Sequence, residues 1–251
     1  VCESIVHQFQ KTFLENREYL MKNAQPTHVQ ISEMLIRDIS AGRYVNGARL
    51  PPERIMALGL GVSVGTLRKS LADMSRKGLL EKRQGSGNYV KTNSQPSSVY
   101  SFFRVELIGG GGLPTANVLS VERVIKPAGF PSFGNSAEAH CIRRLRRLNG
   151  RPAVLEEIWL DGDQSSSIVP EDLSESLYLF YRTALKLWIS EVEDQLTVKP
   201  VPDWSPVEFE IAVGAPALCA QRLSRAQSGA AVEYSLSWID TKIARYVARI
   251  K

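Results

Sequence analysis

The most constraining feature of the chain is a pair of short helical segments that meet at a tight glycine turn over residues 59–61. Before them, residues 29–40 place apolar side chains at helical spacing and predict a first helix. The second helix is expected to begin at Pro52, because proline is tolerated in a first helical turn. Ser63 is a good N-cap for a third helix, which should end at Gly78. This arrangement is typical of a helix-turn-helix.

A glycine-rich hairpin is expected directly after the third helix. Residues 79–83 and 88–91 are predicted to be short strands joined by a tight turn over 84–87. Three helices followed by a hairpin describe a winged helix-turn-helix, which we assign to residues 27–91. Residues 1–26 are assigned to an N-terminal extension, either an upstream stretch or a short added helix, and receive no function.

Positive charge is concentrated in this same segment. Residues 27–92 hold 11 Lys and Arg against 5 Asp and Glu, whereas residues 93–251 hold 17 against 18. A basic module beside a neutral one predicts a polyanion such as DNA as partner of the first, and another kind of partner for the second. On charge alone, a solvated basic surface explains the excess equally well.

The rest of the chain is dominated by strand-like runs. Residues 92–98 are polar with one proline and predict a linker, and residues 99–251 a second domain. Strands are expected over 100–108, 118–125, 141–148, 153–160, 193–198, 217–223 and 232–239, with helices over 174–186 and near 206–213. Because few helices lie between the strands, the expected fold class is α+β with a mixed or antiparallel sheet, not a doubly wound one.

The sequence lacks the patterns of a metal site, a disulfide framework or a membrane span. Cys2, Cys141 and Cys219 are odd in number without C-x-x-C spacing, and the three histidines show no ligand spacing. No run approaches the roughly 20 apolar residues of a spanning helix, and the first residues lack a secretory signal. We therefore expect a cytoplasmic protein with no membrane partner, no metal and no cofactor.

The stretch LPPERIMALGLGVSVGTLRKSLADMSRKGLLEKRQGSGNYV, residues 50–90, resembles the DNA-binding domain of the GntR family of bacterial transcription regulators without a gap. The resemblance implies that double-stranded DNA is bound by the start of the third helix and by the wing. The DNA-binding residues expected on this basis are Arg54, Ser63, Val64, Gly65, Thr66, Arg68, Lys69, Arg83, Gln84, Gly85 and Ser86.

The residue types suit these roles. Arg54 is expected to neutralise a phosphate, and Arg68 to reach a guanine edge. A solvated helix face is the alternative for Arg68 and Lys69. The chain departs from the family at Val64, where an arginine is usual, so the family's operator is not carried over; Val64 suits a thymine methyl instead. Pro52 replaces the common serine.

More loosely, the region from residue 99 to 246 resembles the UTRA effector domain of the HutC subgroup, whose fold is shared with chorismate lyase. The motifs are IRRLRRLNGRPAVLEEIWL, then SESLY and AVEYSLSWID. The resemblance implies a homodimer that binds a small, usually anionic metabolite such as a sugar phosphate or an organic acid. The effector-binding residues that it implies are Thr115, Arg144, Arg146, Glu156, Ser176, Tyr178, Glu233 and Trp238.

Two arginines are central to this expectation. Arg144 and Arg146 lie two residues apart, so on a strand they share a face, and paired guanidiniums suit a phosphate or carboxylate. The glycine run 109–112 is a candidate loop for cradling an anion. The alternatives are a solvated strand face for the arginines and a core position for Trp238.

Together these features predict a sequence-specific DNA-binding transcription regulator, and a repressor by family precedent. Its affinity for a near-palindromic operator would be modulated by an effector. The effector would alter the spacing of the two DNA-binding domains of a dimer across the linker. No Ser/His/Asp or Cys/His set indicates an enzyme. The alternatives are an enzyme of chorismate lyase-like fold that carries a DNA-binding domain, and a DNA-binding protein without effector response.

Overall fold

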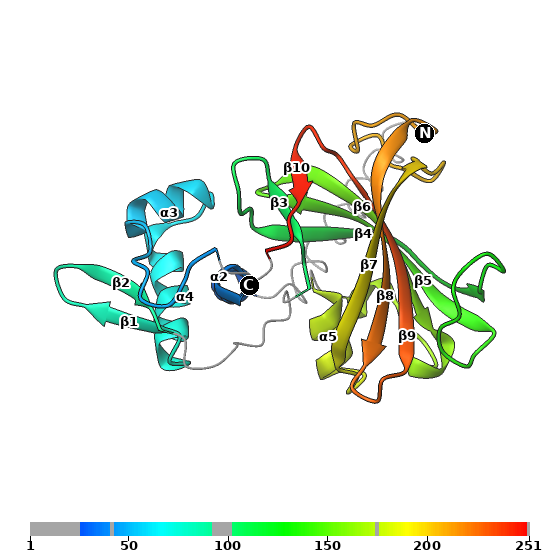
Figure 1. Ribbon diagram of the computed structural model, residues 1–251, viewed down its shortest axis with the longest axis horizontal. Coiled ribbons are helices and arrows are strands. Elements are labelled where there is room, and N and C mark those ends of the chain that lie inside the picture. Colours follow the sequence, from blue (N-terminus) through cyan, green and yellow to red (C-terminus); the bar gives the residue numbers. More distant parts are fainter. Residues whose placement is uncertain (1–25, 41–42, 92–101, 174–175, 250–251) are drawn as a thin grey trace, which may run out of the picture.

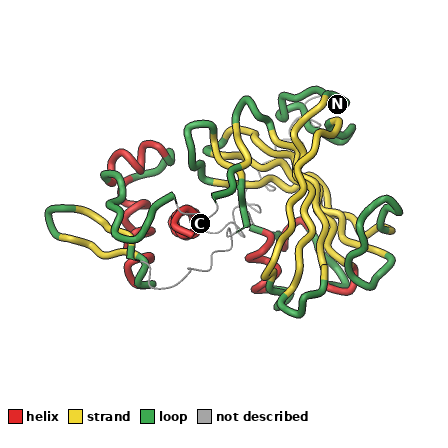
Figure 2. Tube along the Cα trace, in the orientation of Figure 1, coloured by secondary structure: helices red, strands yellow, loops and turns green. Residues whose placement is uncertain are grey.

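A computed structural model describes residues 26–40, 43–91, 102–173 and 176–249, which form a mainly helical part and a mainly stranded part (Figure 1). The expected extension up to residue 25 and the expected linker over 92–98 lie outside the described residues. Figure 2 shows most helices gathered at one end and the long strands at the other. The fold class is therefore α+β with an antiparallel sheet, as predicted.

The helical part has three helices and a hairpin at the predicted places. They are α2 (Thr27–Ser40), α3 (Glu53–Gly59), α4 (Val64–Arg76), β1 (Leu80–Arg83) and β2 (Gly87–Val90). Helix α4 begins where Ser63 Oγ accepts a hydrogen bond from the Thr66 amide at 3.0 Å. It ends before Gly78, whose φ of +73° is one that other residues avoid. The buried side of α4 packs against α2, with Leu67 and Ile31 in a common core.

No single described helix is long and apolar enough to cross a membrane. Only α3 and α4 taken together, which are bent by 110° at the break between them, reach the required length and composition.

The stranded part is built on a six-stranded antiparallel sheet in the order β4-β5-β6-β9-β8-β7. Its strands are β4 (Pro114–Ile125), β5 (Glu138–Leu148), β6 (Arg151–Asp161), β7 (Ile189–Pro200), β8 (Pro216–Ala226) and β9 (Ala231–Ile239). A separate ribbon pairs β3 (Val105–Leu107) with β10 (Ala244–Tyr246). The remaining elements are η1 (Gly162–Gln164), η2 (Pro170–Asp172) and α5 (Leu177–Thr183).

The two faces of the sheet have different characters because side chains alternate along each strand. On β9, Tyr234 and Trp238 pack into an aromatic core that loops carrying Phe130 and Phe209 cover. Helix α5 packs against the opposite face, where Phe180 contributes to a second core. Polar and charged side chains occupy part of that second face, and they form the site described below.

Two predicted elements differ from the structure. The helix expected near 206–213 is a series of turns, in which the amides of Ser205 and Phe209 bond to the carbonyls of Pro202 and Pro206. This loop is shaped by burial of Phe209 against the sheet rather than by helical periodicity. The strand expected over 100–108 is reduced to β3 within the described residues, and β10 was not predicted.

The two parts contact one another at the end of the sheet near β3. Asn149 Nδ2, in the β5–β6 turn, donates to the carbonyl of Gly59 at 2.9 Å, next to the turn between α3 and α4. The guanidinium of Arg43 lies against Gly110 and Gly111, where a Cβ would meet it at 3.2 and 2.4 Å. Leu113 joins the core of the helical part. The glycine run is therefore a contact between the two parts.

Gly134 should be intolerant of substitution. Its φ is +58°, and a Cβ would lie 2.0 Å from Asp161 Cγ, whose carboxylate pairs with Lys126 Nζ at 2.5 Å. We expect Gly134→Ala to lower the free energy of unfolding by about 3–5 kcal/mol, because it displaces one partner of a buried ion pair. Gly214→Ala is the control: its φ is +78° but nothing lies within 4 Å, so only backbone strain of about 1–2 kcal/mol is expected. Urea unfolding of both variants compares them, and equal losses would contradict the packing argument.

Candidate functional site

The start of α4 presents small and polar side chains. Ser63 and Thr66 are engaged in the helix cap, with their hydroxyl oxygens 2.9 Å apart, and Gly65 has no neighbour that crowds its Cα. The backbone of this turn can therefore approach another molecule closely. Val64 is partly buried against the core of the helical part, so only part of it is available for contact.

Exposed cations flank this turn on α3 and α4. Arg54 and Lys69 are exposed. Arg68 Nε pairs with Glu53 Oε2 at 2.6 Å, and its side chain is 68% exposed. An exposed pair of this kind is worth at most about 1 kcal/mol, so the guanidinium can exchange Glu53 for a phosphate or a base edge.

The β1–β2 hairpin carries a second group of cations. Arg83 lies over the ring of Tyr89, with 4.2 Å from Cζ to the ring centroid, and bonds Glu81 at 3.1 Å. Gln84 and Gly85 form the exposed tip, and Ser86 Oγ lies 2.7 Å from the Tyr89 hydroxyl.

Arg49 is a further cation beside the hairpin and was not among the predicted DNA-binding residues. The backbone of Arg49 forms an isolated antiparallel β-bridge with Tyr89. The guanidinium of Arg49 lies against Gly87. It is exposed beside the hairpin. The pairing across 40 residues has no local signal, so only the tertiary fold places Arg49 on this surface.

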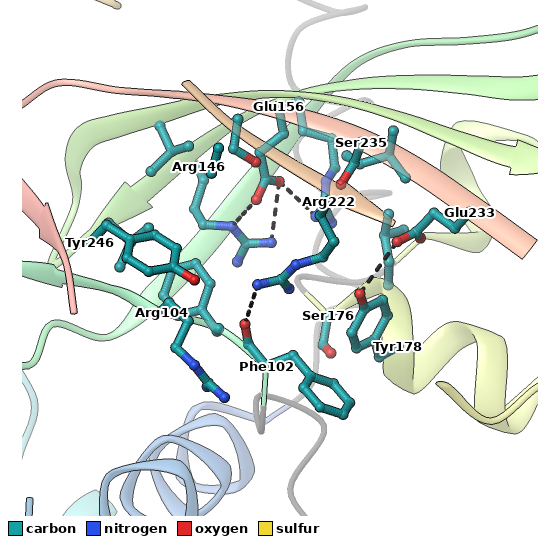
Figure 3. Close-up of a pocket in the computed structure, with 18 residues that line it drawn as sticks. Phe102, Arg104, Arg146, Glu156, Ser176, Tyr178, Arg222, Glu233, Ser235 and Tyr246 are labelled. Carbon is teal, nitrogen blue, oxygen red and sulfur yellow. Dashed lines mark hydrogen bonds and ion pairs between the residues drawn. The ribbon is translucent and has the colours of Figure 1, made fainter. Parts of the chain in front are cut away.

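A cavity of about 100 Å³ opens between α5, the β3 segment and the second face of the sheet (Figure 3). Six of the eight predicted effector residues line it: Arg144, Arg146, Glu156, Ser176, Tyr178 and Glu233. They come from β5, β6, β9 and the start of α5, which the chain brings together only by folding the sheet.

The centre of the cavity is an ion triad on β5 and β6. Glu156 Oε2 accepts from Arg144 Nη2 at 2.7 Å, and Glu156 Oε1 accepts from Arg146 Nε at 2.7 Å. Although burial acts to raise the pKa of Glu156, the two arginines lower it from 4.5 to about 2. Burial lowers the pKa of Arg144, and Glu156 opposes that shift. Arg144 Nε and Nη1 are buried and have no hydrogen-bond partner among the described residues, so two donor atoms remain for another molecule.

A carboxylate at the α5 side has a different environment. Glu233 accepts hydrogen bonds from Tyr181 at 2.7 Å, Ser224 at 2.7 Å and Tyr178 at 3.3 Å. Burial nevertheless raises the pKa of Glu233 and also that of Tyr178. This end of the cavity is therefore rich in hydroxyl groups, with Ser235 also on the lining.

Among the cavity residues that were not predicted are Arg104, Arg222 and Tyr246. Arg222 is held by Asp194 at 2.6 and 2.7 Å and donates to the carbonyl of Phe102 at 2.7 Å. The hydroxyl of Tyr246 donates to the same Asp194 carboxylate at 2.5 Å. These residues belong to β8, β10 and the segment before β3, so no motif in the sequence connects them.

Two predicted effector residues lie elsewhere. Trp238 is buried on the aromatic face, where its Nε1 donates to the carbonyl of Pro200 at 3.0 Å. Strand alternation explains this, because Glu233 and Ser235 point to the cavity and Trp238 falls on the opposite parity. Thr115 pairs with Arg147 near the end of β4 and is outside the cavity lining. The glycine run 109–112 is also outside it, so Trp238, Thr115 and this run lie apart from the other predicted effector residues. Among the described residues, no group of His, Cys, Asp and Glu could hold a metal.

A winged helix-turn-helix with exposed cations, joined to a sheet domain with an arginine-lined cavity, defines an effector-responsive DNA-binding protein. The chain belongs to the gntR family of bacterial regulatory proteins: residues 27–90 match that family, and residues 110–244 match the UTRA domain. It is thus a transcription regulator of the HutC type.

Known regulators resemble it over most of its length. The HTH-type transcriptional regulator SmoD of Agrobacterium fabrum is 56% identical over 226 residues, which is 90% of this chain and 97% of SmoD. The HTH-type transcriptional repressor NagR of Bacillus subtilis is 24% identical over 84% of this chain and 89% of NagR. The ligand-binding domain of a GntR-family regulator from Bordetella bronchiseptica matches 60% of this chain and 98% of its own, with 20% identity and a TM-score of 0.52.

Glu156→Gln should test the triad. We expect it to lower the free energy of unfolding at pH 7 by roughly 3–5 kcal/mol, because two buried guanidiniums lose their counter-charge. The pKa of Glu156 is about 2 in the folded chain, below its ordinary 4.5, so the unfolded chain binds more protons between these values. The stability of the wild type should therefore fall as the pH drops through this window, and that of Glu156→Gln should fall less. Glu208→Gln, at an exposed site, is the control for urea unfolding from pH 7 to pH 3, and an unchanged slope in Glu156→Gln would contradict this account.

Proposed function

We propose that the protein is a cytoplasmic homodimeric repressor whose binding to a near-palindromic operator is relieved by a small anionic metabolite that carries hydroxyl groups. A sugar phosphate or a hydroxylated organic acid has this chemistry. The observation that carries the effector assignment is Arg144, which is buried in the cavity with two unpaired N–H donors.

The charges of the cavity support an anion at its centre. Arg104 and Arg146 line it beside Arg144, and the Glu156 carboxylate bonds to both Arg144 and Arg146. Guanidiniums form short, bidentate bonds with phosphate and carboxylate oxygens. At the α5 end, Glu233 and Ser235 offer acceptors and donors for hydroxyl groups. One part of the cavity thus suits the charged group of an anionic ligand, and the α5 end suits its hydroxyl groups.

The DNA assignment rests on exposure and position. Arg68 and Lys69 project from α4, the helix that enters the major groove in this class of fold. Arg54 would contact a phosphate, and the backbone at Ser63, Val64, Gly65 and Thr66 would approach the groove. The wing would contact DNA through Arg83, Gln84, Gly85 and Ser86, and also through Arg49 beside it.

Dimerisation through the effector domain is part of the proposal. Strands β4 and β7 are the edges of the sheet, and β7 exposes Leu196 and Val198 (50% and 65%). Exposed apolar residues on an edge strand favour pairing with another chain. A reducing compartment agrees with the free thiols of Cys141 and Cys219, because burial raises their pKa values to about 12 and 11 and keeps them protonated.

Operator binding is tested with DNA from directly upstream of the protein's own gene at physiological salt. We expect Arg68→Ala to weaken specific binding by about 10- to 100-fold, the equivalent of a lost base contact of about 1–3 kcal/mol. Arg76→Ala, on the same helix with a 77% exposed side chain, serves as the matched control and should bind like the wild type. Equal binding by wild type and Arg68→Ala on all sequences would refute the assignment.

Effector binding is tested by thermal unfolding of the full chain with a panel of sugar phosphates and hydroxy acids. A ligand at 100 times its dissociation constant should raise the free energy of unfolding by about 2.7 kcal/mol. Arg144→Met should lose this response, whereas Arg182→Met, outside the cavity lining, should keep it. If the stabilising ligand leaves operator affinity unchanged, the protein binds DNA without effector response and the proposed regulation is wrong.

A further inference from the structure

Arg37 is a buried arginine at the boundary of the two domains. It lies on α2, is 1% exposed, and bonds the neighbouring Asp38 carboxylate through Nε and Nη2 at 2.9 and 2.5 Å. Its Nη1 is buried without a hydrogen-bond partner. A cation in this position is expensive to bury unless its surroundings compensate the charge.

A single aromatic ring connects Arg37 to the cavity. The Cζ of Arg37 lies 5.5 Å from the centroid of the Phe103 ring, and the Cζ of Arg146 lies 4.9 Å from the same centroid. Phe103 and Arg146 both line the cavity. Figure 3 shows the blue helix α2 beside Arg104 at the cavity edge, and Figure 1 shows α2 facing β3 and β10. The DNA-binding domain therefore contributes a charge next to the cavity without lining it.

Among the described residues around this boundary, arginines outnumber carboxylates. Within the described residues, the cavity and the adjoining contact bring together seven arginines and five carboxylates. They are Arg37, Arg43, Arg104, Arg144, Arg146, Arg222 and Arg249, with Asp38, Glu106, Glu156, Asp194 and Glu233. Burial is the largest cause that lowers the pKa of Arg104, and the charge of Arg222 comes next. The charge of Arg37 adds a smaller contribution in the same direction. Like charges thus oppose the docking of α2 on the effector domain when the cavity holds no anion.

Any displacement of α2 is transmitted to the DNA-contacting helix. Ser32 Oγ on α2 donates to the carbonyl of Ser70 on α4 at 3.2 Å, and the two helices share one core. The docked position is held at two further points, Asn149 against Gly59 and Arg43 against Gly110. Helix α2 consequently moves with α4 as a unit relative to the sheet.

We infer that an anion in the cavity strengthens the docking of the DNA-binding domain by compensating the charge of Arg37 across Phe103. This inference rests on the proposed function, since the anion is the proposed effector. A docked domain is fixed relative to its own sheet and cannot adjust to the spacing of two half-sites. By linkage, the anion and the operator then oppose each other's binding through Arg37.

Hydrogen exchange of the full chain, measured with and without inorganic phosphate, tests the inference. In the wild type, phosphate should slow exchange in peptides of β5 and β6, and should slow exchange in α2 by at least about threefold. Arg37→Met should keep the protection of β5 and β6 and lose that of α2. Arg37→Lys, which keeps the charge, should restore it. Arg76→Met removes an exposed arginine of the same domain and should respond like the wild type.

The outcomes separate the two proposals. If phosphate protects β5 and β6 but leaves α2 unchanged in the wild type, or still protects α2 in Arg37→Met, the coupling is refuted and the anion site stands. If phosphate protects neither region, both the anion site and the coupling are refuted. Should Arg37→Met fail to fold, Arg37→Gln, which can still bond Asp38, replaces it with the same expected loss.

Discussion

The ion triad of Arg144, Glu156 and Arg146 is the interaction on which the effector domain depends. A carboxylate and two guanidiniums at the centre of a sheet are tolerated only because they compensate one another. The triad is nevertheless one negative charge short, and two donors of Arg144 remain unpaired. The triad therefore compensates most of its own buried charge and leaves two guanidinium donors in the same place, which is the basis of the proposed anion site.

The second organising constraint is the boundary between the domains. The segment from Phe102 to β3 passes the cavity on one side and α2 on the other, so its residues contact both. Arg222 anchors this segment through the carbonyl of Phe102, and Asp194 anchors Arg222. A ligand that changed the charge in the cavity would act directly on this segment, which α2 of the DNA-binding domain contacts through Arg37 and Phe103. No long pathway of side chains is required for the two sites to influence each other.

Much of the helical domain could be predicted because its signals are local. Ser63 caps a helix through its own neighbour Thr66, and Gly78 takes the backbone angle that ends it. Six of the predicted effector residues lie together in one cavity, and the strand pattern alone places Arg144 and Arg146 on one face. The place of Trp238 on the opposite face follows from the same alternation, because Glu233 and Trp238 have opposite parity on β9.

The sequence by itself determined the order of the elements, the charged helix-turn-helix and the alternation that puts arginines on one side of a strand. These depend on contacts within a few residues. Only the tertiary structure decided that Arg49 joins the wing, that Arg222 and Tyr246 line the cavity, and that the glycine run contacts Arg43. Each of these involves partners far apart in the chain, and their proximity arises from sheet register and domain packing, which no local pattern encodes.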